Sequence, residues 1–202
     1  MLVLLRLPLL LLVVLALLGA ASCGGPDPAP ADTSVPTATT PPVAPSPSAA
    51  AAACGAAAQQ ADQGHLHVVD LNQTYAQHPA TSGPHYPVPL PPQPAVYTAP
   101  VVEARAVHNL EHGYVWVYYQ PAGADALSAP VVDALRSAAT GQRKVLLAPY
   151  PQLPADAALD FAAWDELQQC GRGVTAGEAI ATLGAFVTAY REGPLAPEPG
   201  AA

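Results

Sequence analysis

One stretch of the sequence decides the fold: YVWVYYQ, at residues 114–120. It is apolar on both faces and rich in β-branched and aromatic side chains, which is the pattern of a strand whose two faces are both covered. Pro121 and Gly123 follow it and end the strand. The sequence therefore predicts a domain built around a buried central strand.

Helix and strand signals alternate after this strand. Ser128 followed by Ala129 and Pro130 makes a good N-cap and first turn, and Gly141 ends the predicted helix. A second short strand, KVLLA at residues 144–148, ends at Pro149. Residues 157–164 alternate as a strand does but are rich in alanine as a helix is, so both interpretations stay open.

A second helix begins at a capping box, in which Glu178 follows Thr175 by three residues. It runs to about Arg191, and one face carries four large side chains: Ile180, Leu183, Val187 and Tyr190. Residues 70–107 are Pro-rich and predict a long wrapping loop. The fold class we expect is α+β: a single small domain with a short β-sheet packed by two helices and a long Pro-rich N-terminal wrapping segment.

The N-terminus carries an export signal. Residues 1–22 hold one cation, Arg6, then an apolar run and small residues that lead directly to Cys23. This arrangement resembles a bacterial lipobox, which implies cleavage before Cys23 and acylation of that residue, for example with palmitate. The alternative is an uncleaved transmembrane anchor, but the apolar run is short for a span and contains Pro8. We therefore expect a lipoprotein anchored to the cell membrane on its extracytoplasmic face.

Composition divides the rest of the chain. Residues 23–53 are mostly Pro, Ala, Ser and Thr and predict a disordered tether behind the lipidated cysteine. Residues 54–194 are expected to form the globular extracytoplasmic domain, and residues 195–202 a disordered tail. The formal net charge is −8. So acidic a chain lacks the basic stripe that binding to nucleic acid needs, and cations are its natural small partners.

The three cysteines suggest one disulfide. If Cys23 is lipidated, Cys54 and Cys170 remain in an oxidising compartment, where pairing is the simplest outcome. A thiol ligand to a metal is the alternative, but neither cysteine lies near the histidines in the sequence. We expect a bond between Cys54 and Cys170.

The six histidines are the most informative feature, because all of them lie between His65 and His112. Three motifs hold most of them: GHLH at residues 64–67, TSGPHY at residues 81–86 and VHNLEHG at residues 107–113. Single histidines often only bond to the backbone, and we expect that of His78. The clustering of the others instead predicts a metal site.

The last motif carries the most chemistry. If it forms a helical turn, His108 and His112 lie four residues apart on one face, where their imidazoles can share a metal ion. Glu111 is a further ligand, an orienting residue or a general base. His85 follows a rigid Gly-Pro turn.

One upstream histidine completes the predicted ligands. His67, or alternatively His65 on the same side of an extended segment, joins His85, His108, His112 and Glu111. Met1 is the only methionine, so nitrogen and oxygen ligands dominate. They suit a divalent transition metal, with zinc or copper favoured.

At these motifs the chain resembles a bacterial family known as domain of unknown function 3105. The TSGPHY and VHNLEHG motifs carry the resemblance, together with Leu146 to Pro149, Ala163-Trp164 and Phe186 to Arg191. Members look like exported or membrane-anchored proteins, often with a histidine upstream, at the place of His67 or His65. The resemblance supports the assignment of residues 54–194 to one domain more than it supports any activity.

Three functions remain open. The favoured one is a metal-binding module that buffers, delivers or senses a metal at the cell surface, without catalysis. A metallohydrolase is the second: HNLEH fits the H-x-x-E-H pattern, with Glu111 as base and Glu166 or Glu178 as a distant ligand. Gly113 and the strand that follows argue against the long helix such enzymes use. The third is a non-catalytic adaptor that binds a protein through residues 86–97.

Overall fold

The computed structural model describes residues 53–201. The predicted signal peptide, the lipidated Cys23 and the tether before residue 53 lie outside the described residues. In the described range, no helix is long and apolar enough to cross a membrane.

The predicted central strand is strand β2 (Val115–Tyr119), and all five of its residues are buried. It pairs in parallel with β3 (Val145–Pro149) and antiparallel with β4 (Ala157–Ala163). The full sheet has the order β1-β5-β4-β2-β3, where β5 is Glu166–Gly171 and β1 is Ala58–Gln59. The strand interpretation of residues 157–164 is therefore the right one.

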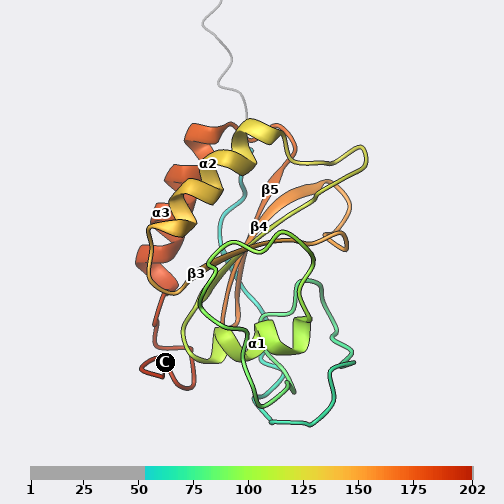
Figure 1. The fold of residues 1–202 in the computed structure, drawn as a ribbon, viewed down its shortest axis with the longest axis vertical. Coiled ribbons are helices and arrows are strands. Elements are labelled where there is room, and N and C mark those ends of the chain that lie inside the picture. Colours follow the sequence, from blue (N-terminus) through green and yellow to red (C-terminus); the bar gives the residue numbers. More distant parts are fainter. Residues whose placement is uncertain (1–52, 202) are drawn as a thin grey trace, which may run out of the picture. The chain divides into compact units, whose positions relative to one another are not determined.

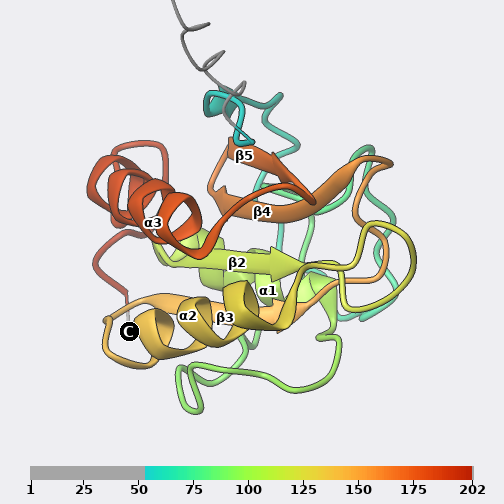
Figure 2. The same cartoon turned by 90° about the horizontal axis from the view of Figure 1, so that it is seen from above.

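Alternation along β2 creates two cores, one on each face of the sheet. Val115 and Val117 point toward helices α2 (Ala129–Thr140) and α3 (Ala176–Tyr190). Trp116 packs on the opposite face with helix α1 (Glu103–Glu111) and the segment before it. Figures 1 and 2 show α2 and α3 side by side on one side of the sheet and α1 on the other. The fold is a small α+β domain, as expected.

The helix signals hold in detail, with one exception. Ser128 and Gly141 stand at the two cap positions of α2, although the Ser128 side chain makes no cap hydrogen bond, and Thr175 and Glu178 form the predicted capping box of α3. On α3, however, Phe186 is buried and Ile180 is exposed, although Ile180 was expected on the buried face. Helix α3 packs against both the sheet and α2. The buried face of the helix is therefore the one that carries Phe186, not the one that carries Ile180.

Helix α1 is the largest difference from the sequence-based expectation. A wrapping loop was expected to run to residue 107, but the helix begins at Glu103. Its N-cap, Val102, makes no side-chain cap hydrogen bond, so the usual signal for a helix start is missing. The long Pro-rich segment before it does wrap the domain, and it covers the same face of the sheet as α1.

Both ends of the described chain are held against the domain, one by a disulfide and the other by packing and a hydrogen bond. Cys54 and Cys170 form the predicted disulfide, which ties the start of the domain to β5. At the other end, the segment after Pro194 was expected to be a disordered tail, but it packs on the domain. Ala196 is buried, and the backbone N–H of Glu198 donates to the carbonyl oxygen of Glu111 at 3.0 Å.

Candidate metal centre

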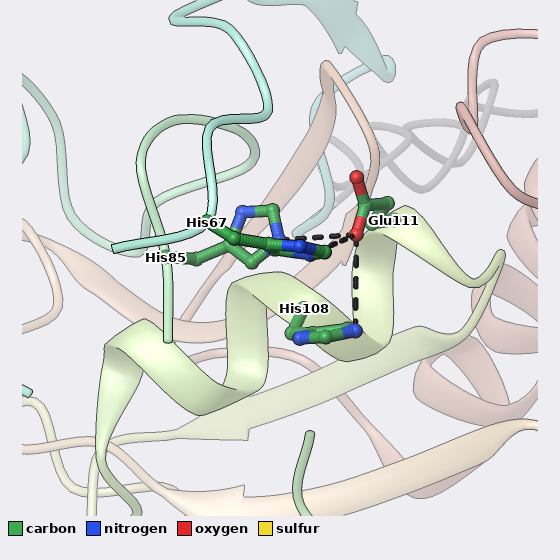
Figure 3. Close-up of side chains that lie close together, drawn as sticks. All are labelled: His67, His85, His108 and Glu111. Carbon is green, nitrogen blue, oxygen red and sulfur yellow. Dashed lines mark hydrogen bonds and ion pairs between the residues drawn. The ribbon is translucent and has the colours of Figure 1, made fainter. Parts of the chain in front are cut away.

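Three imidazoles converge on one carboxylate oxygen (Figure 3). The Nε2 atoms of His67, His85 and His108 lie 3.2, 3.0 and 3.8 Å from Oε2 of Glu111. The four ligand atoms all lie within 4.8 Å of one another. They come from three places in the sequence, so the fold assembles the cluster.

Two extended segments position His67 and His85. The two residues form an isolated parallel bridge, in which His85 N donates to the Leu66 carbonyl at 2.9 Å and Val68 N donates to the His85 carbonyl at 2.8 Å. The bridge places the two imidazoles with ring centroids 4.8 Å apart. It also selects His67 over His65, because His67 forms the bridge and belongs to the ligand group, whereas His65 does neither.

The TSGPHY motif is a turn that aims His85. Gly83 has a φ of +125°, a backbone conformation that residues with a side chain rarely adopt. A Cβ there would lie 3.0 Å from the Tyr75 ring. The Tyr75 hydroxyl donates to the Pro84 carbonyl at 2.9 Å. Ser82 is buried, and its hydroxyl oxygen accepts from Gln63 N at 3.0 Å. Ser82, Gly83 and Pro84 thus help to fix the backbone that carries the imidazole.

The last turn of α1 supplies His108 and Glu111, which lie three residues apart on one face. Gly113 ends this helix with a φ of +76°, and its N–H donates to the Leu110 carbonyl at 2.8 Å. A Cβ at Gly113 would lie 2.8 Å from Cα of Glu192, so the chain has room only for glycine there.

In His85 and His108, the hydrogen bond at Nδ1 decides whether the other ring nitrogen, Nε2, carries a lone pair or a proton. His85 Nδ1 lies 2.8 Å from the Gly83 carbonyl, and His108 Nδ1 lies 2.8 Å from the Tyr86 carbonyl. A carbonyl only accepts, so both Nδ1 atoms carry the proton and donate it. In a neutral ring Nε2 then keeps its lone pair, aimed at the cluster. Burial lowers the pKa of His108, with the Tyr86 bond opposing, and so favours the neutral ring.

The cluster is closed on one side and open on the other. The side chains of His85 and Glu111 are 0% and 2% exposed, whereas His67 is 45% exposed. The Trp164 ring lies near His85 with the two ring planes almost perpendicular, at 81°, and the centroids 6.2 Å apart. A buried carboxylate beside inward-facing lone pairs is costly unless a cation joins them. The exposed His67 gives such a cation a route from solvent.

The spacing of the donors suits a small transition metal. At a metal–ligand distance of about 2.0–2.1 Å, ligands of a tetrahedral ion lie roughly 3.3 Å apart. The three nitrogen-to-oxygen distances, 3.2, 3.0 and 3.8 Å, bracket that value. With all four ligand atoms within 4.8 Å of one another, three imidazoles and one carboxylate could hold one ion.

A second group adjoins the first. His112 follows α1 as its C-cap, and its Nε2 lies 3.1 Å from Nε2 of His108. It also lies 3.6 Å from Oε2 of Glu198. Glu111, His112 and Glu198 together offer ligand atoms within 4.8 Å of one another. His112 does lie beside His108, as the i, i+4 spacing predicts, but it was expected to share the first group and instead belongs to this one with Glu198.

Two further sequence-based candidates have other roles. Glu178 caps α3 by bonding to Thr175, and Glu166 lies in β5, so in the described residues neither belongs to a metal-ligand group. His78 bonds through Nδ1 to Glu103 and Tyr150, away from the cluster. Sequence reasoning missed Glu198, whose Pro-, Gly- and Ala-rich surroundings give no signal for a ligand.

The fold and the site define a small α+β domain with a buried His/Glu cluster between one helix and a wrapping segment. A family model described as "Protein of unknown function (DUF3105)" matches residues 67–202, which confirms the resemblance seen in the histidine motifs. The chain belongs to this family, whose model spans the cluster and the C-terminal segment. No curated protein and no solved structure matches the chain.

Proposed function

We propose that this domain binds a divalent transition metal ion through His67, His85, His108 and Glu111. One observation carries the proposal: two buried imidazoles, each with its Nδ1 proton given to a backbone carbonyl, turn Nε2 lone pairs toward a buried carboxylate. A metal cation can accept a lone pair from each of these imidazoles and from the carboxylate together.

Zinc and cupric ion are the metals that these donors favour. Imidazole nitrogen and carboxylate oxygen are common ligands of both, and zinc takes four such ligands in a tetrahedron. The chain offers no methionine thioether beyond Met1. Cys54 and Cys170 are joined to each other, so their sulfurs are not thiolate ligands.

The place of action is part of the same proposal. The signal sequence and Cys23 support a lipoprotein held at the extracytoplasmic face of the membrane. Residues 23–53 would then act as a tether that lifts the domain from the lipid. A half-exposed histidine at the mouth of the site supports exchange of metal with the surroundings, so the function proposed is buffering, delivery or sensing of metal at the cell surface.

Metal titration tests the proposal directly. The full-length protein, purified in detergent and stripped of metal, is titrated with zinc and with cupric ion, and bound metal is counted by elemental analysis. We expect stoichiometric binding at micromolar metal. The double variant His85→Ala/His108→Ala should lose it.

His65→Ala is the matched control, because His65 is an exposed histidine two residues from His67. It should bind as the unchanged protein does. Absence of binding at micromolar metal, or binding that survives the double substitution, would overturn the proposal. The histidines would then be structural, and an adaptor that contacts a protein through residues 86–97 would be the better hypothesis.

A further inference from the structure

Glu111 has two carboxylate oxygens, and the three imidazoles engage one of them. The contacts from His67, His85 and His108 all go to Oε2. Figure 3 shows the other oxygen of Glu111 pointing away from these three rings. A carboxylate in this position can bind one ion through each oxygen.

The second group, Glu111, His112 and Glu198, shares this carboxylate with the first. His112 Nε2 and Glu198 Oε2 are 3.6 Å apart, close to the roughly 3.3 Å expected of two ligands on one tetrahedral ion. An oxygen of Glu111 lies within 4.8 Å of both atoms. His112 also stands 3.1 Å from His108, nitrogen to nitrogen, so the two groups are in direct contact.

Glu198 is placed by the fold, although its side chain is 55% exposed. Its N–H donates to the carbonyl of Glu111, so the backbone of the C-terminal segment is bonded to the residue that both groups share. Lys144 holds the same segment, donating from Nζ to the carbonyls of Pro199 and Ala201 at 2.9 and 2.7 Å. Lys144 also donates to the His112 carbonyl at 2.8 Å. One buried ammonium group thereby fixes both ligands of the second group relative to α1.

We infer that the cluster is a two-metal centre, in which Glu111 bridges the ion held by the three histidines and a second ion held by His112 and Glu198. This inference rests on the proposed function. Known two-metal sites hold their ions about 3.5–4 Å apart. The second ion has fewer protein ligands and faces solvent, so its remaining positions are open to water or to a small anionic ligand.

Stoichiometry and spin coupling test the inference on the full-length protein. We expect two equivalents of zinc in the unchanged protein and one in Glu198→Gln, which keeps the shape of the side chain and removes its charge. Asp133→Asn, an exposed carboxylate on α2, is the matched control and should keep two. With cupric ion, the electron paramagnetic resonance signal should grow over the first equivalent and fall over the second, because bridged cupric ions couple.

The outcomes separate the two proposals. One equivalent in the unchanged protein, undiminished in Glu198→Gln, overturns the second ion and leaves the metal-binding function standing. Two equivalents with additive, uncoupled signals overturn the bridging role of Glu111. Absence of any bound metal overturns both proposals. Loss of one equivalent in Glu198→Gln, with the first affinity unchanged, supports the two-metal centre.

Discussion

Nε2 of His85 lies 3.0 Å from Oε2 of Glu111, and neither side chain is open to solvent. Because Nδ1 of the same ring gives its proton to the Gly83 carbonyl, a neutral His85 would turn a lone pair toward a carboxylate oxygen. Either a second proton or a metal cation must lie between the two atoms. This relationship makes Glu111 the residue whose replacement best separates metal binding from packing.

Glu111→Gln should abolish stabilisation by zinc while leaving the metal-free protein folded. The amide of glutamine can donate to the His85 lone pair, so packing survives, but the anionic ligand is lost. A ligand at one hundred times its dissociation constant stabilises a protein by about 2.7 kcal/mol. Thermal unfolding with and without zinc should show a rise in melting temperature for the unchanged protein. An equal rise in Glu111→Gln would contradict a ligand role for this carboxylate.

Asp160 should make stability fall as pH rises through the weakly acidic range. Burial raises the pKa of this carboxyl from 3.8 to about 7, with the hydrogen bond from Gln169 opposing. No described residue bonds its Oδ1. Between about pH 4 and 7 the unfolded chain loses this proton while the folded protein keeps it, so stability decreases with pH, and above about pH 7 the contribution is constant.

The magnitude follows from the width of that range. Each pH unit corresponds to about 1.36 kcal/mol, so the loss by pH 7 is on the order of 4 kcal/mol. Urea unfolding with a chelator present, which removes the metal, should show this slope in the unchanged protein. Asp160→Asn should flatten it and raise stability at pH 8. A slope that persists in Asp160→Asn would assign it to other groups.

The disulfide should contribute to stability but not to the metal site. It joins residues 116 apart in the sequence. Closing a loop of that length stabilises a fold by about 4–5 kcal/mol in the chain-entropy model. Replacing Cys54 and Cys170 together by alanine should lower the denaturant midpoint accordingly. Metal stoichiometry should be unchanged, and its loss would mean that β5 positions the site.

Strong local signals explain which elements the sequence predicts. The strand at 115–119 is apolar on both faces, and α3 begins with a capping box, so both could be found without a structure. Strand β5 could not, because its sequence, ELQQCG, is largely polar and lies near the sheet edge beside the short β1. Helix α1 lacks a capping side chain and follows a Pro-rich segment, so its start at Glu103 could not be predicted from the sequence.

The site was predictable only in part, for a related reason. The spacing of His108 and Glu111 on one helical turn and the rigid turn before His85 are local features. The selection of His67 over His65 depends on a long-range bridge between His67 and His85. Strand alternation alone places His65 and His67 on the same side and cannot choose between them. Glu198 enters through the packing of the C-terminal segment, and that packing depends on Lys144, the only lysine in the chain.

Lys144→Met should release the C-terminal segment and with it the second metal ion. The side chain of Lys144 is 7% exposed, and its ammonium group pairs with Glu192 at 3.1 Å besides bonding three carbonyls. Methionine keeps the apolar stem but donates to none of them. From the hydrogen bonds lost we expect destabilisation of roughly 2–4 kcal/mol. Digestion by a carboxypeptidase should then remove residues after 193 that resist it in the unchanged protein.

The matched control is the neighbouring cation. Arg143 also pairs with Glu192, but its side chain is 65% exposed, and exposed ion pairs contribute little to stability. Arg143→Gln should keep both the resistance to carboxypeptidase and two equivalents of zinc, whereas Lys144→Met should bind one. If Lys144→Met loses its C-terminal residues and still binds two equivalents, Glu198 is no ligand, and the second ion must be held by Glu111 and His112 without it.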